Sequence, residues 1–192
     1  MKKFIASYGL ILTILITTLG VSAAAFTDSA KILGATFSVG SSDLKLLMDL
    51  AGSLDASNLY DELVGPTFEN ISPNWETNYL VKLYNNSPED VVLFTVADYE
   101  TANDPNELRQ DINVEPFLWD DNNNNGVLDA GELGNSLGVK TIVKWKTEGF
   151  DLGLLQSGEV LPMVFKFSTG SVSAAKQGST ATFDFLVESV SL

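Results

Sequence analysis

The residues best suited to chemistry form an acidic, asparagine-rich run from 121 to 132. The run fits the calcium-loop pattern D-x-[DN]-x-[DN]-G-x5-E at every fixed position. Side-chain oxygens recur on alternate residues, as a tight curl around an ion requires, and Gly126 permits the sharp turn. The pattern predicts a Ca²⁺ site with side-chain ligands and one backbone carbonyl, that of Val127. The predicted ligands are Asp121, Asn123, Asn125, Val127, Asp129 and Glu132.

The neighbouring residues predict a structural site held by a loop between two strands, over 120–133. Pro116 just upstream, with Gly131 and Gly134 near the end of the run, is unfavourable for the flanking helices of an EF-hand. Three of the predicted ligands carry formal charge, so we expect a weak affinity, about 10⁻⁴ to 10⁻³ M. The alternative is an ordinary surface turn that binds no ion.

The residue types that most enzymes use for acid–base or nucleophilic chemistry are missing. The chain has no histidine and no cysteine. This excludes an HExxH zinc site, a histidine-assisted serine nucleophile and any disulfide. We therefore predict that the protein is not an enzyme. The three tryptophans could form a sugar-stacking face of an adhesion module, but core packing is the preferred interpretation; they are Trp75, Trp119 and Trp145.

The N-terminus has the features of a secretory signal peptide. We predict that this segment, residues 1–24, forms a helix. Two lysines follow Met1, an almost uncharged apolar run extends over 4–21, and three alanines end at Ala25. We predict cleavage between Ala24 and Ala25, which leaves 25–192 as a single domain. Retention of the segment as a membrane anchor is the alternative, because its length is close to the roughly 20 residues of a span.

The charge of the chain restricts its partners. Eleven basic and 25 acidic residues give a net charge of −14. Removal of 1–24 takes away two lysines and no acid, which leaves 9 − 25 = −16. Such a surface repels nucleic acid and anionic lipid and attracts divalent cations. We therefore expect no nucleic-acid partner, and membrane contact only through an uncleaved signal segment.

Hydrophobic alternation predicts an all-β fold with seven to nine strands. Extended segments are predicted at 34–46, 77–84, 91–96, 112–119, 139–145, 158–168 and 179–190. The segments 77–84 and 91–96 are expected to form an antiparallel hairpin, and Pro116 is expected at an edge or bulge. Residues 58–63 are read either as a short helix or as part of a loop. Four phenylalanines at period-2 spacing are expected in a core between sheets: Phe165, Phe167, Phe183 and Phe185.

The beginning of the processed chain carries a family resemblance. Ala25-Phe26-Thr27-Asp28, followed by Ala35-Thr36-Phe37-Ser38-Val39-Gly40 and Asp43-Leu44, resembles the start of TasA and camelysin proteins. Ser42 and Asp43 occupy the places of that family's Leu-Asp, which is a small departure. The resemblance is strongest over 25–46, 68–96 and 115–135 and weak over 47–66.

The resemblance implies an antiparallel jelly-roll-like β-sandwich, secretion or cell-surface location, a signal peptidase during export, and fibre formation in an extracellular or biofilm matrix. In this interpretation 25–39 is a donor strand that completes the sheet of the next copy, so that copies associate into filaments. Its apolar anchors would be Phe26, Phe37 and Val39. The alternative is that the segment pairs within its own domain. The camelysin branch also implies a second possibility, a secreted peptidase.

Overall fold

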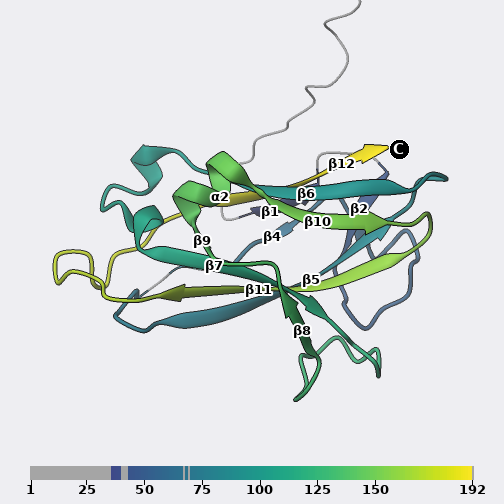
Figure 1. Cartoon of the computed structure of the whole chain (residues 1–192), viewed down its shortest axis with the longest axis horizontal. Helices are drawn as coiled ribbons and strands as arrows, with labels where there is room; N and C mark the ends of the chain where they lie inside the picture. The colour runs from purple at the N-terminus through teal and green to yellow at the C-terminus, as the bar shows by residue number, and fades with distance from the viewer. Residues whose placement is uncertain (1–35, 40–42, 67, 69, 192) are drawn as a thin grey trace, which may run out of the picture. The chain divides into compact units, whose positions relative to one another are not determined.

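The computed structural model describes residues 36–39, 43–66, 68 and 70–191. All of them belong to one compact unit, Ile32–Leu192. The predicted signal helix and the predictions at Ala24, Ala25 and Phe26 lie outside the described residues. Two sheets dominate this unit, with β6, β10 and β12 in one layer and β5, β7 and β11 in the other (Figure 1). The prediction of an all-β, two-sheet protein is thus confirmed, and the jelly-roll arrangement stays a prediction.

The first sheet, sheet A, has five strands in the order β10-β6-β12-β1-β4. Its antiparallel part joins β10 (Phe150–Leu155), β6 (Val91–Asp98) and β12 (Asp184–Ser191). The strand β1 (Thr36–Val39) then pairs with β12 in parallel and with β4 (Glu62–Val64) antiparallel. The first described strand therefore lies between the last strand and a three-residue edge strand.

The second sheet, sheet B, follows the order β3-β2-β5-β11-β7-β8, and β9 also pairs with β7. Every pairing in sheet B is antiparallel. Its strands are β3 (Leu59–Tyr60), β2 (Leu44–Leu47), β5 (Glu76–Asn85), β11 (Val160–Thr169), β7 (Ile112–Trp119), β8 (Leu133–Ser136) and β9 (Lys140–Thr141). Two 3₁₀ turns, Thr101–Asn103 and Leu108–Gln110, connect β6 to β7.

Aromatic side chains fill the space between the sheets. The four phenylalanines predicted for the core are all fully buried, which confirms that prediction. Phe68 joins them, with its ring centroid 5.0 Å from that of Phe167 and 5.3 Å from that of Phe183. Burial of each such ring contributes roughly 2–3 kcal/mol, so this cluster stabilises the contact between the two sheets.

The prediction of a strand at 139–145 is wrong beyond Thr141. The helix α2 (Ile142–Glu148) begins there, with the Thr141 hydroxyl accepting a hydrogen bond from the Lys144 amide at 3.3 Å. Ile142 and Trp145, three residues apart, are fully buried on one helix face, whereas Lys144 is exposed. Helical spacing of these two apolar residues outweighs the alternation on which the strand prediction depended.

Two other local predictions also need correction. The strands β5 and β6 do not form a hairpin, because β5 pairs with β2 and β11 while β6 pairs with β10 and β12. The chain therefore crosses from one sheet to the other between them. Residues 58–63 form β3 and the start of β4 instead of a helix. The twelve strands found among the described residues exceed the predicted seven to nine, and several of the additional ones have only two to four residues.

The expectation for Pro116 is confirmed in part. On one side of β7, Pro116 is the register partner of Phe165 in β11. On its other side, β7 pairs with β9 at Asn113 and Val114 and with β8 from Phe117 onward. Pro116 lies between these two short partners, at a place where its lack of an N–H breaks no ladder bond. Its carbonyl still accepts a hydrogen bond from the Leu137 amide at 2.8 Å.

Among the described residues, none of the helices has the length and apolar character that crossing a membrane requires.

Candidate metal site and its surroundings

The predicted calcium loop lies between β7 and β8 and folds over the outer face of sheet B. Along β5, Val81 and Leu83 belong to the core, so Lys82 between them points to the opposite face. Lys82 is nevertheless only 5% exposed. Leu47, Trp119 and Val164 are buried as well but lie outside the main core cluster. The loop thus contributes to a second, smaller buried region on the outside of the sheet.

Asp121 connects the beginning of the loop to its turn and to the sheet. One carboxylate oxygen accepts a hydrogen bond from the Asn125 amide at 3.1 Å, and the other accepts from the Gly126 amide at 3.1 Å. The second oxygen also lies 2.7 Å from the Lys82 ammonium. Burial by itself would raise the pKa of Asp121, but the Lys82 bond, the two amides and the Lys82 charge together hold it below its usual value.

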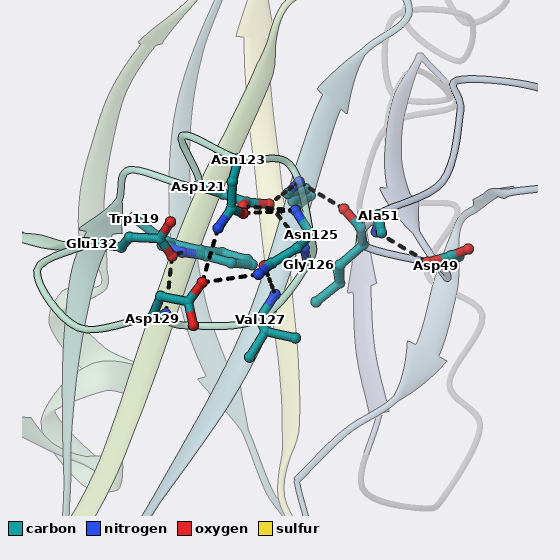
Figure 2. A network of polar contacts seen from close by, with 12 residues as sticks. Asp49, Ala51, Trp119, Asp121, Asn123, Asn125, Gly126, Val127, Asp129 and Glu132 are labelled. Carbon is teal, nitrogen blue, oxygen red and sulfur yellow. Dashed lines mark hydrogen bonds and ion pairs between the residues drawn. The ribbon is translucent and has the colours of Figure 1, made fainter.

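The amide side chains of the loop converge on Asp129. Asn123 and Asn125 each donate an Nδ2 hydrogen bond to Oδ2 of Asp129 at 2.9 Å. Their carbonyl oxygens accept backbone bonds, from the Asn125 amide at 3.0 Å and from the Val127 amide at 2.8 Å. Figure 2 shows the side chains of Asp121, Asn123, Asn125 and Asp129 gathered inside the loop. The loop is therefore curled around Asp129, which accepts an N–H group from each of the two asparagines.

Glu132 closes the loop from its C-terminal end. Its Oε2 accepts hydrogen bonds from the Trp119 indole N–H at 3.2 Å and from the Asp129 amide at 3.0 Å. The residue is 7% exposed, and the backbone bond from the Asp120 amide to the Glu132 carbonyl, 2.8 Å long, joins the two ends of the loop. Trp119 therefore fixes one carboxylate oxygen of Glu132 from the last residue of β7.

The predicted ligands are brought together, but not as a cluster of carboxylates alone. Hydrogen bonds link Asp121, Asn123, Asn125, Asp129 and Glu132 into one network. The side chain of Val127 is 56% exposed, in agreement with a role for its backbone only. Within the described part of the chain, no three acidic, histidine or cysteine side chains are grouped closely enough to hold a metal by themselves. Asn oxygens would have to contribute, and these suit a hard cation such as Ca²⁺.

Sequence reasoning missed Lys82, which comes from a strand 39 residues before Asp121. Besides its bond to Asp121, the Lys82 ammonium donates to the Leu50 carbonyl at 2.6 Å and lies 5.3 Å from the centroid of the Trp119 ring. It therefore joins the loop 120–133 to the loop 48–58. The one available signal was the position of Lys82 between Leu80 and Tyr84 on the outer face of the strand, where a lysine is ordinarily solvent-exposed.

The two loops also touch through their backbones. Gly126 has a φ of +71°, and a Cβ there would lie 2.8 Å from the Ala51 nitrogen and 2.9 Å from the Leu50 carbonyl carbon. The facing loop is held by its own contacts, including the bond from the Ala51 amide to the Asp49 carboxylate at 3.0 Å (Figure 2). Glycine at 126 is therefore required both by the turn and by this close approach.

The predicted donor-strand anchors Phe37 and Val39 lie in β1, within the sheet of their own chain. Phe37 is fully buried, with ring centroids of Phe165, Tyr79 and Phe185 at 5.0, 5.5 and 5.9 Å. Val39 is half-buried, and its amide donates to the Asp61 carbonyl at 2.9 Å. This arrangement agrees with the alternative that β1 pairs within its own domain when the chain is alone.

The tryptophans do not form an exposed face. Trp145 is fully buried and Trp119 is 2% exposed, while Trp75 is half-buried with its ring 6.0 Å from that of Phe68. The preferred interpretation of these residues as packing groups is consistent with their burial.

Comparison of the sequence with protein-family models and with curated proteins found no match to either.

Proposed function

We propose that this chain is a secreted structural protein of the cell surface or extracellular matrix, that its domain is jelly-roll-like, and that its copies assemble by exchanging β1. The proposal also includes a structural Ca²⁺ site in the loop 120–133. The observation that carries the assembly proposal is the position of Phe37. A fully buried ring on the first described strand is an anchor that an identical site in another copy would also accept.

The topology of β1 supports an exchange of this kind. A strand at one end of the described chain can leave its sheet without unthreading any other element, and β1 has only four residues. Its removal would expose the ladder groups of β12 and β4 and a cavity beside Phe165 and Phe185. A β1 from a neighbouring copy offers the same backbone groups and the same ring. Repeated head to tail, the contact does not close on itself and generates a filament.

Apolar side chains near β4, the edge strand of sheet A, form an exposed surface that a second copy could cover. Val64 on β4 is 84% exposed and Met48 is 60% exposed. Together with Leu47, Leu63, Tyr79 and Leu80, they line an open apolar hollow. Without 1–24 the net charge is 9 − 25 = −16, which opposes association, so salt or divalent cations should favour it by screening the repulsion between copies.

The calcium part of the proposal is supported by the curl of the loop and by its oxygen-rich ligand set. Asp121, Asn123, Asn125, Asp129, Glu132 and the Val127 carbonyl would hold the ion, with the two Asn amides turning their oxygens inward. The ion would fasten a loop in a chain that has no disulfide to do so. At 10 mM Ca²⁺, a dissociation constant of about 10⁻⁴ to 10⁻³ M corresponds to roughly 1.4–2.7 kcal/mol of stabilisation.

The test of assembly uses a reversible lock on β1. Ser38 and Glu62 are antiparallel register partners on β1 and β4 and are both half-buried. The sequence has no cysteine of its own that could pair with the introduced ones. The double variant Ser38→Cys/Glu62→Cys, expressed without residues 1–24, should remain monomeric when oxidised and form filaments in the electron microscope after reduction. The matched control is Val92→Cys/Leu154→Cys, which links β6 to β10 in the same sheet. We expect this control to form filaments in both redox states.

Three outcomes would contradict the proposal. Filaments from the oxidised β1 lock would rule out strand exchange as the mechanism, although not assembly as such. Monomers under every condition, including high salt and 10 mM Ca²⁺, would rule out assembly. A melting temperature that is unchanged between chelator and 10 mM Ca²⁺ would rule out the calcium site independently of both.

A further inference from the structure

Lys82 is a buried lysine on the outer face of sheet B. Its side chain is 6% exposed and that of Asp121 is 1% exposed. Three groups surround the ammonium: the Asp121 carboxylate at 2.7 Å, the Leu50 carbonyl at 2.6 Å and the face of the Trp119 ring. All three N–H groups of a lysine need partners when buried, and these contacts provide a carboxylate, a carbonyl and a π-face.

We propose that Lys82 is a tethered cation that closes the loop 120–133 without a metal ion and thereby sets how tightly the loop binds a divalent cation. The loop has three acidic residues among its predicted ligands, and Lys82 already neutralises the one at its first position. The ammonium also holds Leu50 of the facing loop, so a single positive charge fastens both loops to β5. The affinity part of this inference rests on the proposed calcium site, whereas the closing role does not.

The ammonium and a bound divalent ion would act against each other. An ion that used Asp121 as a ligand would lie within a few ångströms of Nζ of Lys82, and like charges at such a distance repel strongly where water is scarce. The same ammonium stabilises the ion-free loop, so that less stability remains to be gained from binding. Both effects lower the affinity for Ca²⁺. Removal of the charge should therefore raise that affinity, by about tenfold or more.

The test compares Lys82→Met with the wild-type chain. Methionine keeps an unbranched side chain of similar length next to Trp119 and removes the charge. In chelator, Asp121 loses its counter-ion, so the melting temperature should fall by about 6–20 °C. Calcium titration, followed by calorimetry and by the melting temperature, should show tighter binding to Lys82→Met and recovery of most of the lost melting temperature. The wild-type chain should gain much less.

Two further variants make the result specific to the buried pair. Lys45→Met removes a lysine of the neighbouring strand whose ion pair with Asp61 is exposed. This variant should leave the calcium affinity unchanged and should shift the melting temperature by no more than a few degrees. Lys82→Met/Asp121→Asn removes both buried charges. It should melt above Lys82→Met in chelator and lose the calcium response. If Lys82→Met alone does not fold in chelator, a folded double variant assigns that loss to the unpaired charge of Asp121 and so still tests the closing role.

The outcomes separate this inference from the proposed calcium site. Equal calcium affinities in wild type and Lys82→Met would overturn the inference and leave the calcium site standing. Binding by Lys82→Met but not by the wild type would support the inference and overturn calcium as a natural ligand. No binding by either chain would overturn the affinity-setting role together with the calcium site. An unchanged melting temperature of Lys82→Met in chelator would overturn the closing role.

Discussion

The two faces of sheet B are buried in different ways. The inner face is covered by sheet A and α2 and consists of aromatic rings in mutual contact, such as Phe165 against Trp145 at 5.6 Å. The part of the outer face around Lys82 is covered by two loops and depends on a few directed contacts of Lys82 and Asp121. An apolar core is stabilised by area and close packing, whereas a buried ion pair is stabilised only while both charges are present. Loss of side-chain volume therefore destabilises the apolar core, whereas replacement of both charges of the buried ion pair together is tolerated.

The largest expected effect belongs to the inner face. Trp145 is fully buried, its ring stacks at 4.7 Å and 13° on Phe185, and its indole N–H donates to the Thr95 carbonyl at 3.0 Å. Trp145→Ala should lower the free energy of unfolding by about 4–5 kcal/mol, from the cavity and the lost hydrogen bond. Urea unfolding measures this loss, and Lys144→Ala, at an exposed position of the same helix, is the control. A loss below about 2 kcal/mol would mean that the core closes around the gap.

On the outer face, Gly126→Ala should cost less but should affect the loop first. The new methyl group adds positive-φ strain to an overlap with the backbone of Leu50 and Ala51, for a total of about 2–4 kcal/mol. Gly131→Ala is the matched control, because Gly131 has φ +93° but a Cβ there would meet nothing within 4 Å. That variant should lose only about 1 kcal/mol. Equal losses in the two variants would show that the contact between the loops contributes nothing.

The same contrast explains which parts of the structure the sequence predicts. Alternation identified the inner-face phenylalanines, because a strand with one dry face leaves that periodicity in the sequence. It failed at 139–145, where alternation and helical spacing fit the same residues and the Thr141 cap with Gly149 at the end decides for a helix. It also failed for the pairing of β5 with β6, since adjacency in the chain does not decide which sheet a strand joins.

The candidate site divides in the same manner. The curl of the loop from Asp121 to Glu132 follows from local residue types, because Asp121 and Glu132 accept hydrogen bonds from backbone N–H groups only four or five and three residues away. Lys82 could not be predicted from its neighbours, because its burial depends on two loops that approach it from 32 and 39 residues away. Contacts of that range depend on the tertiary fold and leave no periodic pattern.

Acid should weaken the outer face in a manner that Asp121 controls. Because the folded pKa of Asp121 is lowered from its ordinary value of 3.8, its contribution to stability is complete above that value and is lost as the pH falls through the folded pKa. Asp121→Asn should be less stable than wild type at pH 7, and the difference should shrink as the pH is lowered from about 5 to 2. The midpoint of urea unfolding at each pH measures this effect.

The control for acid is Asp61→Asn, which removes the exposed ion pair with Lys45 and should cost about 0–1 kcal/mol at neutral pH. A difference between wild type and Asp121→Asn that stays constant down to pH 2 would contradict the assignment of Asp121 as a charged partner of Lys82.

The smallest expected effect concerns Tyr79. Its ring lies on the inner face of sheet B, and its hydroxyl contacts β4, the edge strand of sheet A. The ring stacks on Phe37 at 5.5 Å, and the hydroxyl donates to the Val64 carbonyl of β4 at 2.7 Å. Burial raises the pKa of Tyr79 to about 12 from 10.0. A raised pKa means that the contribution to stability is complete below pH 10 and is lost as the pH rises toward 12.

Tyr79→Phe should therefore cost only about 0.5–1.5 kcal/mol at neutral pH, from the single hydrogen bond. Between pH 10 and 12 the variant should lose less stability than the wild type, because phenylalanine has no proton to release. Tyr60→Phe, on the exposed edge strand β3, is the control and should follow the wild type throughout. If Tyr79→Phe and the wild type lose the same stability up to pH 12, the hydroxyl of Tyr79 is not protected by burial. The contact between Tyr79 and β4 would then be looser than the 2.7 Å hydrogen bond to Val64 indicates.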